Sequence, residues 1–126
     1  MSDQLFSFEK LTVYQKSLSF SHQIYSLTQK WPREYLYGLT DQIRRASLSI
    51  SLNTAEGTSR TRKDYRHFLT ISRGSCYECV AILQLSLQLY LLSSDQYDNL
   101  YNKVLEISKM LSGLRTSLQR LLSTKP

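Results

Sequence analysis

The sequence predicts an all-α protein, an antiparallel up-down-up-down four-helix bundle. The 126 residues include only four Gly and two Pro, so long helices are possible, whereas a sandwich or barrel needs turn residues about every ten positions. Apolar residues recur at helical spacing along four long segments. The composition, 41% hydrophobic and 21% charged, is typical of globular proteins, and the length suits one domain that covers residues 1–126.

The first predicted helix covers about residues 8–30, with Ser7 as its candidate N-cap. The Trp31-Pro32 pair is expected to end it. Its apolar side chains form two stripes on nearly opposite sides: Leu11, Tyr14, Leu18 and Tyr25 on one side, and Val13, Phe20, Ile24 and Leu27 on the other. A surface helix needs only one apolar stripe. The second stripe therefore predicts that this helix is covered on both sides, within the bundle or between subunits.

The second predicted helix covers about residues 39–56 and also has two apolar faces, one through Ile43 and Ile50 and one through Leu48 and Leu52. Gly57 follows it directly. Glycine is the residue best suited to the left-handed conformation that ends many helices. We therefore expect Gly57 to terminate this helix.

The third predicted helix covers about residues 62–92, capped by Thr61 with Asp64 three positions later. Its apolar face is predicted to include Ser72, Cys76 and Cys79, while Arg66, Arg73, Tyr77 and Gln84 lie on the opposite, wetter face. The fourth helix covers about residues 95–122. It follows a capping box formed by Ser93 and Gln96, and it carries the cleanest heptad in the chain, from Tyr97 to Leu121.

Two cysteines, Cys76 and Cys79, match the C-x-x-C pattern. A redox role requires the first cysteine at a helix N-terminus, where its pKa is lowered, but this pair lies deep within a predicted helix. A zinc site needs two further ligands, and His22 and His67 show no suitable spacing. We therefore interpret both cysteines as small core residues.

Other catalytic or cofactor motifs are missing from the sequence. A di-iron bundle requires Glu-x-x-His pairs, and none occurs. Glycine-rich phosphate loops are also absent. The sequence predicts a non-enzymatic protein without metal or cofactor.

The net charge is +6, with 16 Lys and Arg against 10 Asp and Glu. Positive charge gathers at the predicted start of the third helix, where it could contact phosphates, with Tyr65 and Tyr77 available for base stacking. The candidate nucleic-acid-binding residues are Arg44, Arg60, Arg62, Lys63, Arg66 and Arg73. The alternative interpretation is a solvated helix end whose arginines form salt bridges between subunits.

The N-terminal residues lack the basic start and apolar run of a signal peptide. No apolar segment approaches the ~18 residues of a membrane span. We therefore expect a cytoplasmic protein without a membrane partner.

The segments Leu39-Thr40-Asp41-Gln42-Ile43-Arg44-Arg45-Ala46 and Ala55-Glu56-Gly57 carry a family resemblance. Together with Phe8-Glu9-Lys10-Leu11, Trp31-Pro32-Arg33-Glu34 and Gly74-Ser75, they make the chain similar to the bacterial 23S rRNA intervening-sequence proteins, which are encoded within insertions in large-subunit rRNA genes. Three positions depart from the family: Thr54 replaces an isoleucine, and Cys76 and Cys79 stand where aliphatic or polar residues are common.

The resemblance implies a left-handed antiparallel four-helix bundle that assembles into a ring-like homo-oligomer, commonly a pentamer. It also implies kinship with the accessory variability determinant proteins of diversity-generating retroelements, which bind a reverse transcriptase and nucleic acid through a basic surface. RNA, DNA, a reverse transcriptase or another protein are thus the expected partners beside the chain itself.

Polar residues of the matched segments are expected to form a structural network. These residues are Gln42, Arg45, Asn53, Glu56 and Glu78. Buried polar groups must find partners, and such networks can fix helix register. Our hypothesis is that Arg45 or Arg60 pairs with Glu56 or Glu78 and helps to specify the fold. The function predicted from the sequence is thus that of an oligomeric accessory protein that contacts nucleic acid, with a protein–protein scaffold as the alternative.

Overall fold

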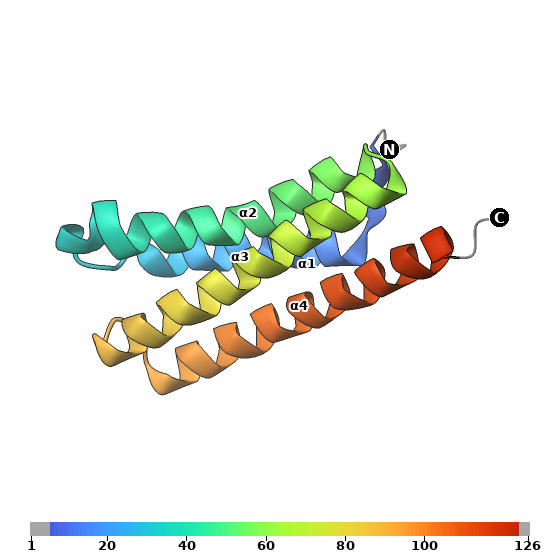
Figure 1. Ribbon diagram of the computed structural model, residues 1–126. Helices are drawn as coiled ribbons and strands as arrows, with labels where there is room; N and C mark the ends of the chain where they lie inside the picture. The colour runs from blue at the N-terminus through green and yellow to red at the C-terminus, as the bar shows by residue number, and fades with distance from the viewer. Residues whose placement is uncertain (1–5, 124–126) are drawn as a thin grey trace.

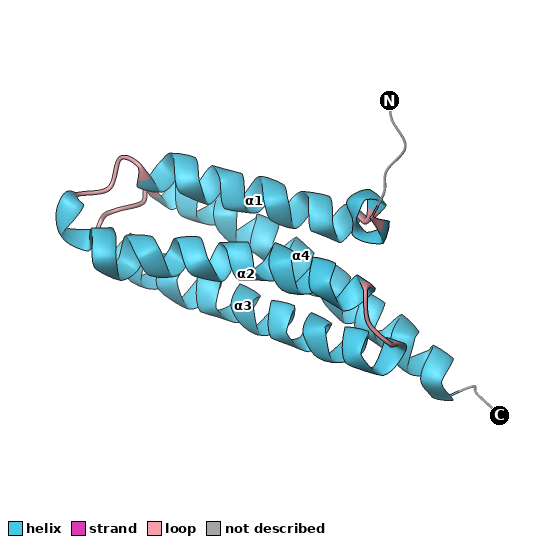
Figure 2. Ribbon diagram, turned by 90° about the horizontal axis from the view of Figure 1, so that it is seen from above, coloured by secondary structure: helices cyan, strands magenta, loops and turns pink. Residues whose placement is uncertain are grey.

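Four long helices make up most of the structure (Figure 1). The computed structural model describes residues 6–123, and none of these belongs to a β-strand. The helices are α1 (Thr12–Thr28), α2 (Asp41–Thr58), α3 (Arg62–Gln88) and α4 (Ser94–Ser123). Successive helices pack side by side, as the two views in Figures 1 and 2 show. The predicted all-α class with four helices is confirmed.

Within the described part of the chain, no helix is both long enough and apolar enough to cross a membrane. The first five residues, on which the expectation about a signal peptide rests, lie outside the described residues.

The first helix starts later than predicted, because residues 7–10 form a separate 3-10 turn. Leu11 is extended (φ −72°, ψ 117°) and interrupts the helical backbone before Thr12. The prediction that Ser7 caps this helix is wrong. Instead, the Phe6 amide donates to the Glu9 carboxylate (3.1 Å) and closes the 3-10 turn. The α1 helix itself starts without a side-chain cap.

The connection between α1 and α2 winds through two short helical turns, at Arg33–Tyr35 and Leu36–Thr40. The backbone of Gly38 departs from helical geometry here (φ −115°, ψ −107°). The side chain of Trp31 is buried. Because the turn at Leu36–Thr40 precedes it, α2 starts at Asp41, two residues later than predicted.

Gly57 does not end α2 in the left-handed conformation, and that prediction is wrong. The helix continues to Thr58, and no glycine among the described residues has a positive φ. The glycine has a packing role instead. A Cβ atom at Gly57 would lie 2.6 Å from Cδ1 of Tyr65 and 3.0 Å from Cβ of Phe68. Glycine therefore lets the end of α2 approach the start of α3.

The third helix ends at Gln88, four residues before the predicted position. Tyr90 takes the left-handed conformation (φ 62°) that glycine usually supplies. The Leu91 amide donates to the Ser86 carbonyl (2.9 Å), and the Tyr90 amide donates to the Leu87 carbonyl (3.1 Å). This pair of bonds is a Schellman motif. The sequence has tyrosine and not glycine at this position, so it does not predict that the helix ends here.

Of the three side-chain caps predicted from the sequence, the two at the starts of α3 and α4 are confirmed. The Thr61 hydroxyl accepts from the Asp64 amide (3.2 Å) at the start of α3. At the start of α4, the Ser93 amide donates to Gln96 Oε1 (2.9 Å), and the Gln96 amide donates to the Ser93 hydroxyl (3.1 Å). This reciprocal pair satisfies two amides that have no partner within the helix.

The interface between α2 and α3 is built from small hydroxyl-bearing side chains. Ser72 is fully buried; its hydroxyl donates to the Ile50 carbonyl (3.0 Å) and lies 3.1 Å from the Thr54 hydroxyl. One turn further, the Ser75 hydroxyl donates to the Ser49 hydroxyl (2.9 Å). Small side chains let two helices approach closely, and the hydrogen bonds satisfy the buried hydroxyls. The larger core side chains include Phe20, Ile24, Ile43, Ile50, Leu69, Leu83, Leu100, Ile107 and Leu111.

Candidate nucleic-acid interface

The start of α3 presents the predicted basic residues. Arg62 and Lys63 are exposed in its first turn. Neither forms an ion pair with any residue that the structure describes. Arg60 differs, because its guanidinium donates two hydrogen bonds to the Glu56 carboxylate (2.6 and 2.9 Å) and lies over the Phe68 ring at 5.2 Å. The free positive charge here therefore belongs to Arg62 and Lys63.

Arg66 and Arg73 are half-buried, although the sequence predicts them on the wetter face of this helix. Their Nε atoms are buried and have no hydrogen-bond partner among the described residues. An unpaired buried donor is costly, and neither guanidinium has an acidic partner in the described part of the chain. Both lie close enough to α4 for their charges to act on Arg115 of that helix.

Arg115 of α4 completes this group. Its Nε donates to the hydroxyl of Thr70 (2.9 Å), which lies on α3 between Arg66 and Arg73. Desolvation lowers the pKa of the Arg115 guanidinium, and the positive charges of Arg73 and Arg66 lower it further. We call Arg66, Arg73 and Arg115 the arginine cluster.

Arg115 is not among the candidate residues predicted from the sequence. The available signal was its position between Leu114 and Leu118 of the heptad, which places it at the border of the helix contact. Its partners on α3 depend on the register between the two helices, which the heptad of α4 does not determine.

Arg44 lies apart from the other candidate residues. Its Nε donates to the Thr28 hydroxyl (2.9 Å), and its guanidinium lies 4.7 Å from the centre of the Tyr25 ring. Both contacts are with α1, near the start of α2, whereas the arginine cluster lies between α3 and α4. The structure therefore does not bring Arg44 to the basic start of α3.

The two tyrosines proposed for base stacking have different environments. The Tyr65 side chain is half-buried against Gly57, and burial raises the pKa of its hydroxyl. Tyr77 is 65% exposed, and the guanidinium of Arg73 lies 5.8 Å from the centre of its ring. Of the two, only Tyr77 therefore presents its ring to a ligand.

The residues of the predicted polar network divide into separate groups. Gln42, Arg45 and Glu78 line one shallow hollow between α2 and α3. Arg45 pairs with Asp41 (2.9 Å), and Glu56 pairs with Arg60, so one of the suggested pairs forms. Asn53 donates to the carbonyl and hydroxyl oxygens of Ser49 (2.9 Å each). Both ion pairs are exposed, and such pairs contribute little stability. A role in specifying the fold stays a prediction.

Cys76 and Cys79 are buried in the core as free thiols, as expected. Burial raises the pKa of the Cys76 thiol from 9.0 to about 12. The pKa of Cys79 is raised as well, first by burial and then by the nearby Cys76 and Glu78. Because the thiolate is the reactive form, raised values disfavour redox chemistry at this pair.

These raised values predict a loss of stability at alkaline pH. Above pH 9 the unfolded chain releases thiol protons that the folded chain retains, so the free energy of unfolding falls as pH rises toward about 12. Each thiol contributes a slope of up to about 1.4 kcal/mol per pH unit. Urea unfolding of the wild type and of the Cys76→Ala/Cys79→Ala double variant measures this contribution. Tyr65, whose pKa is also raised by burial, is present in both proteins, so its contribution cancels in the comparison. An identical pH slope in both proteins would therefore contradict the prediction.

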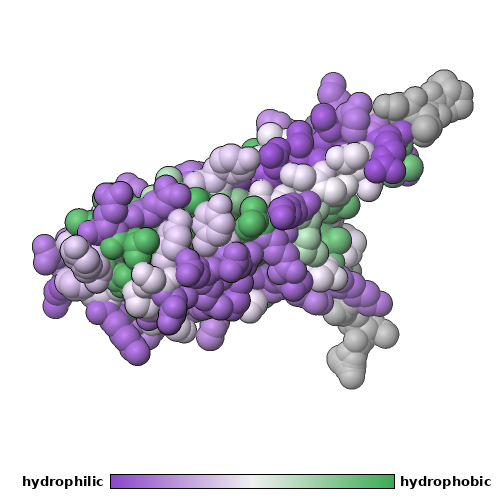
Figure 3. Space-filling view, turned by 90° about the horizontal axis from the view of Figure 1, so that it is seen from below, coloured by the Kyte–Doolittle hydropathy of each residue, from purple (hydrophilic) through white to green (hydrophobic). Residues whose placement is uncertain are grey.

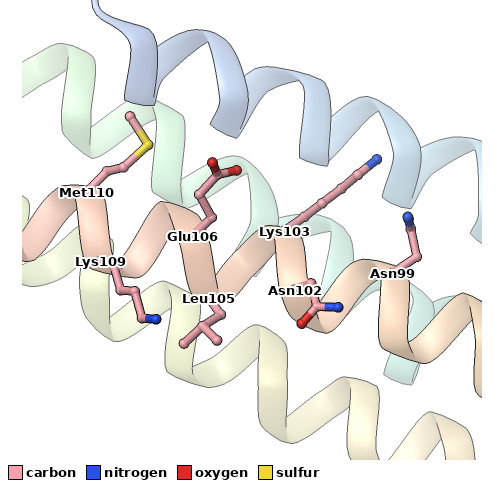
Figure 4. A pocket seen from close by; sticks show the side chains of 7 residues that line it. All are labelled: Asn99, Asn102, Lys103, Leu105, Glu106, Lys109 and Met110. Atoms are coloured by element: carbon pink, nitrogen blue, oxygen red, sulfur yellow. The ribbon is translucent and has the colours of Figure 1, made fainter.

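One surface hollow lies along α4 and has a volume of about 590 Å³. Figure 4 shows that its seven lining side chains all come from α4 and point to both sides of the helix. Three of them already link α4 to α1: Lys103 donates to Gln23, Gln23 donates to Asn99, and Glu106 pairs with Lys16. This hollow therefore offers no convergent catalytic group.

The face of the molecule drawn in Figure 3 is largely hydrophilic, with separate hydrophobic patches. In the described part of the chain, no three His, Cys, Asp or Glu side chains come together as a metal site. His22 and His67 are both exposed. The arginine cluster and the neighbouring start of α3 thus form the best-defined candidate site.

Comparison with known proteins places the chain in a family. Residues 9–113 match the 23S rRNA-intervening sequence protein family. Among solved structures, the chain is similar to a protein of unknown function from the S23 ribosomal protein family of Bacteroides thetaiotaomicron. The two are 27% identical, with a TM-score of 0.77, over 82% of this chain and 95% of that one. No curated protein matches the sequence. The match to the family spans most of the chain, which therefore belongs to the 23S rRNA-intervening sequence proteins.

Proposed function

We propose that this protein is a non-enzymatic, oligomeric accessory protein that binds nucleic acid through the basic surface at the start of α3. The arginine cluster is the observation that carries this proposal. Its three guanidinium groups have no acidic partner among the described residues. Arg115 donates to Thr70 of α3 and its pKa is lowered in part by the charges of Arg73 and Arg66, while Arg62 and Lys63 extend the positive charge to the helix start. Phosphates neutralise such charge and satisfy its donors. The family is named for sequences that interrupt 23S rRNA, and RNA or DNA is the proposed partner.

The proposed oligomer is a ring of bundles, five in number, with the helices of each in up-down-up-down order. The ring and the number five follow from the family resemblance; one observation supports the helix order, and a second supports a subunit interface. The contacts Lys16–Glu106 and Gln23–Asn99 link α1 and α4 in opposite sequence order. The second apolar stripes predicted for the first two helices include Leu18, Tyr25 and Leu52. These side chains are 40–58% exposed, and a subunit interface would cover them. A reverse transcriptase or another protein could bind such a ring in the cytoplasm.

Replacing Arg62, Lys63 and Arg66 together by glutamine tests nucleic-acid binding. Each phosphate contact contributes about 0.7–0.9 to the slope of log affinity against log salt. The triple variant should therefore lower the magnitude of this slope by roughly two to three. Fluorescence anisotropy with labelled RNA and DNA, between about 50 and about 200 mM salt, measures the slope.

The matched control removes the same charge elsewhere. Lys30, Arg33 and Arg45 lie at the other end of α2 or in the connection before it, and their glutamine triple variant should keep the wild-type slope. Light scattering reports the oligomer mass of both variants. An unchanged slope in the first variant would contradict the proposal. If that variant instead dissociates into monomers, the protein–protein scaffold is the better description.

A further inference from the structure

We propose that the outer groove between α3 and α4 binds one single strand of nucleic acid, with phosphates on the arginine cluster and a base against Tyr77. This inference rests on the proposed function and specifies its ligand. The groove combines two kinds of group that a single strand requires, a positively charged track and an exposed aromatic ring. Both lie on the same side of the contact between the two helices.

The register of the two helices places these groups in one line. Thr70 of α3 meets Arg115 of α4 through a hydrogen bond of 2.9 Å. Seven residues further along α3 is Tyr77, and seven residues back along α4 is Ser108. These two residues line one hollow together. A separation of seven residues is about two helical turns. Tyr77 therefore lies on the same face of α3 as Thr70, and Ser108 lies on the same face of α4 as Arg115, each about 10 Å further along its helix.

The hollow beyond Tyr77 has a volume of about 330 Å³ and an uncharged lining. Val80, Ala81 and Leu105 contribute apolar surface, and Tyr101 contributes a second aromatic ring from α4. Gln84 and Ser108 add hydrogen-bonding groups that could meet the edge of a base. Among the described residues, no carboxylate lines the hollow to repel a phosphate.

Arg73 connects the charged and aromatic parts of the groove. Its guanidinium lies 5.8 Å from the centre of the Tyr77 ring, and its positive charge acts on Arg115. A nucleotide whose base stacks on Tyr77 would thus have its phosphate near Arg73. The segment of α3 from Arg66, through Arg73, to the hollow at Gln84 is about 27 Å long, enough for several nucleotides.

A single strand fits these observations better than a duplex. In a duplex the bases are paired and stacked within the helix, so an aromatic side chain on the protein surface cannot stack on them. Unpaired bases can be turned outward onto such a side chain. Since Tyr77 is the exposed ring beside the arginine cluster, the geometry favours an unpaired ligand, and stacking gives little preference for sequence.

The test compares oligo(dT) and oligo(U) of about 12 nucleotides with a duplex of the same length, by fluorescence anisotropy on the full chain. We expect both single strands to bind more tightly than the duplex. Tyr77→Ala should weaken single-strand binding by about 5- to 150-fold, and Tyr77→Phe should retain it because the ring is kept. Arg115→Gln should lower the magnitude of the salt slope by about 0.7.

Matched controls use Tyr37→Ala and Arg33→Gln, two exposed residues away from the groove. Both should bind like the wild type, and oligomer mass should be unchanged in every variant. Equal binding of duplex and single strand, with no effect of Tyr77→Ala, would overturn the inference and leave the proposed function intact. Absence of binding to every probe would overturn both. A change of oligomer mass in Tyr77→Ala without nucleic-acid binding would show instead that the groove is a contact between subunits.

Discussion

Replacing Gly57 by alanine is expected to destabilise the protein by about 1–2 kcal/mol. The new Cβ would lie 2.6 Å from Tyr65 Cδ1 and 3.0 Å from Phe68 Cβ. The Phe68 Cβ is fixed to the backbone, so the helices themselves must separate. Overpacking of this kind costs about 1–3 kcal/mol, and it exceeds the gain of about 0.5–1 kcal/mol that alanine brings to a helix. Urea unfolding followed by circular dichroism measures the loss.

Two other glycines provide the opposite control. Gly74 and Gly113 lie within α3 and α4, and a Cβ atom at either position would have no neighbouring side chain within 4 Å among the described residues. Alanine at each should therefore stabilise the protein by about 0.5–1 kcal/mol. A stabilising effect at all three positions would mean that α2 and α3 separate there without cost.

The sequence identifies most helical features that depend on neighbouring residues. The caps at Thr61 and at Ser93 with Gln96 follow local patterns, and both form as predicted. Local patterns fail where tertiary contacts decide. Gly57 follows an apolar helix, as a terminator would, but its role is to let α3 approach, and Tyr90 ends α3 in a conformation that favours glycine. Neither outcome follows from propensity.

The candidate site shows the same division between local and tertiary information. The charge at Arg62 and Lys63 is visible in the sequence, since those residues are neighbours. The arginine cluster is not visible, because Arg115 lies more than forty residues from Arg73 along the chain. Helical periodicity places Arg66 and Arg73 away from the core. It does not predict that a second helix covers them partly and adds a third guanidinium.

Replacing Ser72 by valine is expected to have the larger effect on stability, a loss of about 2–4 kcal/mol. Ser72 is fully buried between α2 and α3, where its hydroxyl donates to the Ile50 carbonyl (3.0 Å) and meets Thr54 (3.1 Å). Valine removes these hydrogen bonds, at a cost of about 1 kcal/mol. It also adds a methyl group at a fully buried position between the two helices, which costs about 1–3 kcal/mol more. Urea unfolding at neutral pH measures the sum.

Two further variants separate the causes. Ser72→Ala removes the hydroxyl without adding volume, and because Thr54 keeps its own bond to the Ile50 carbonyl (2.7 Å), the cost should be about 1 kcal/mol. Ser72→Thr keeps the hydroxyl and adds one methyl group, so its cost reports packing alone. Equal losses for valine and alanine would mean that the interface has spare room. The small hydroxyl side chains would then serve hydrogen bonding only, and the close approach of α2 and α3 would depend on Gly57.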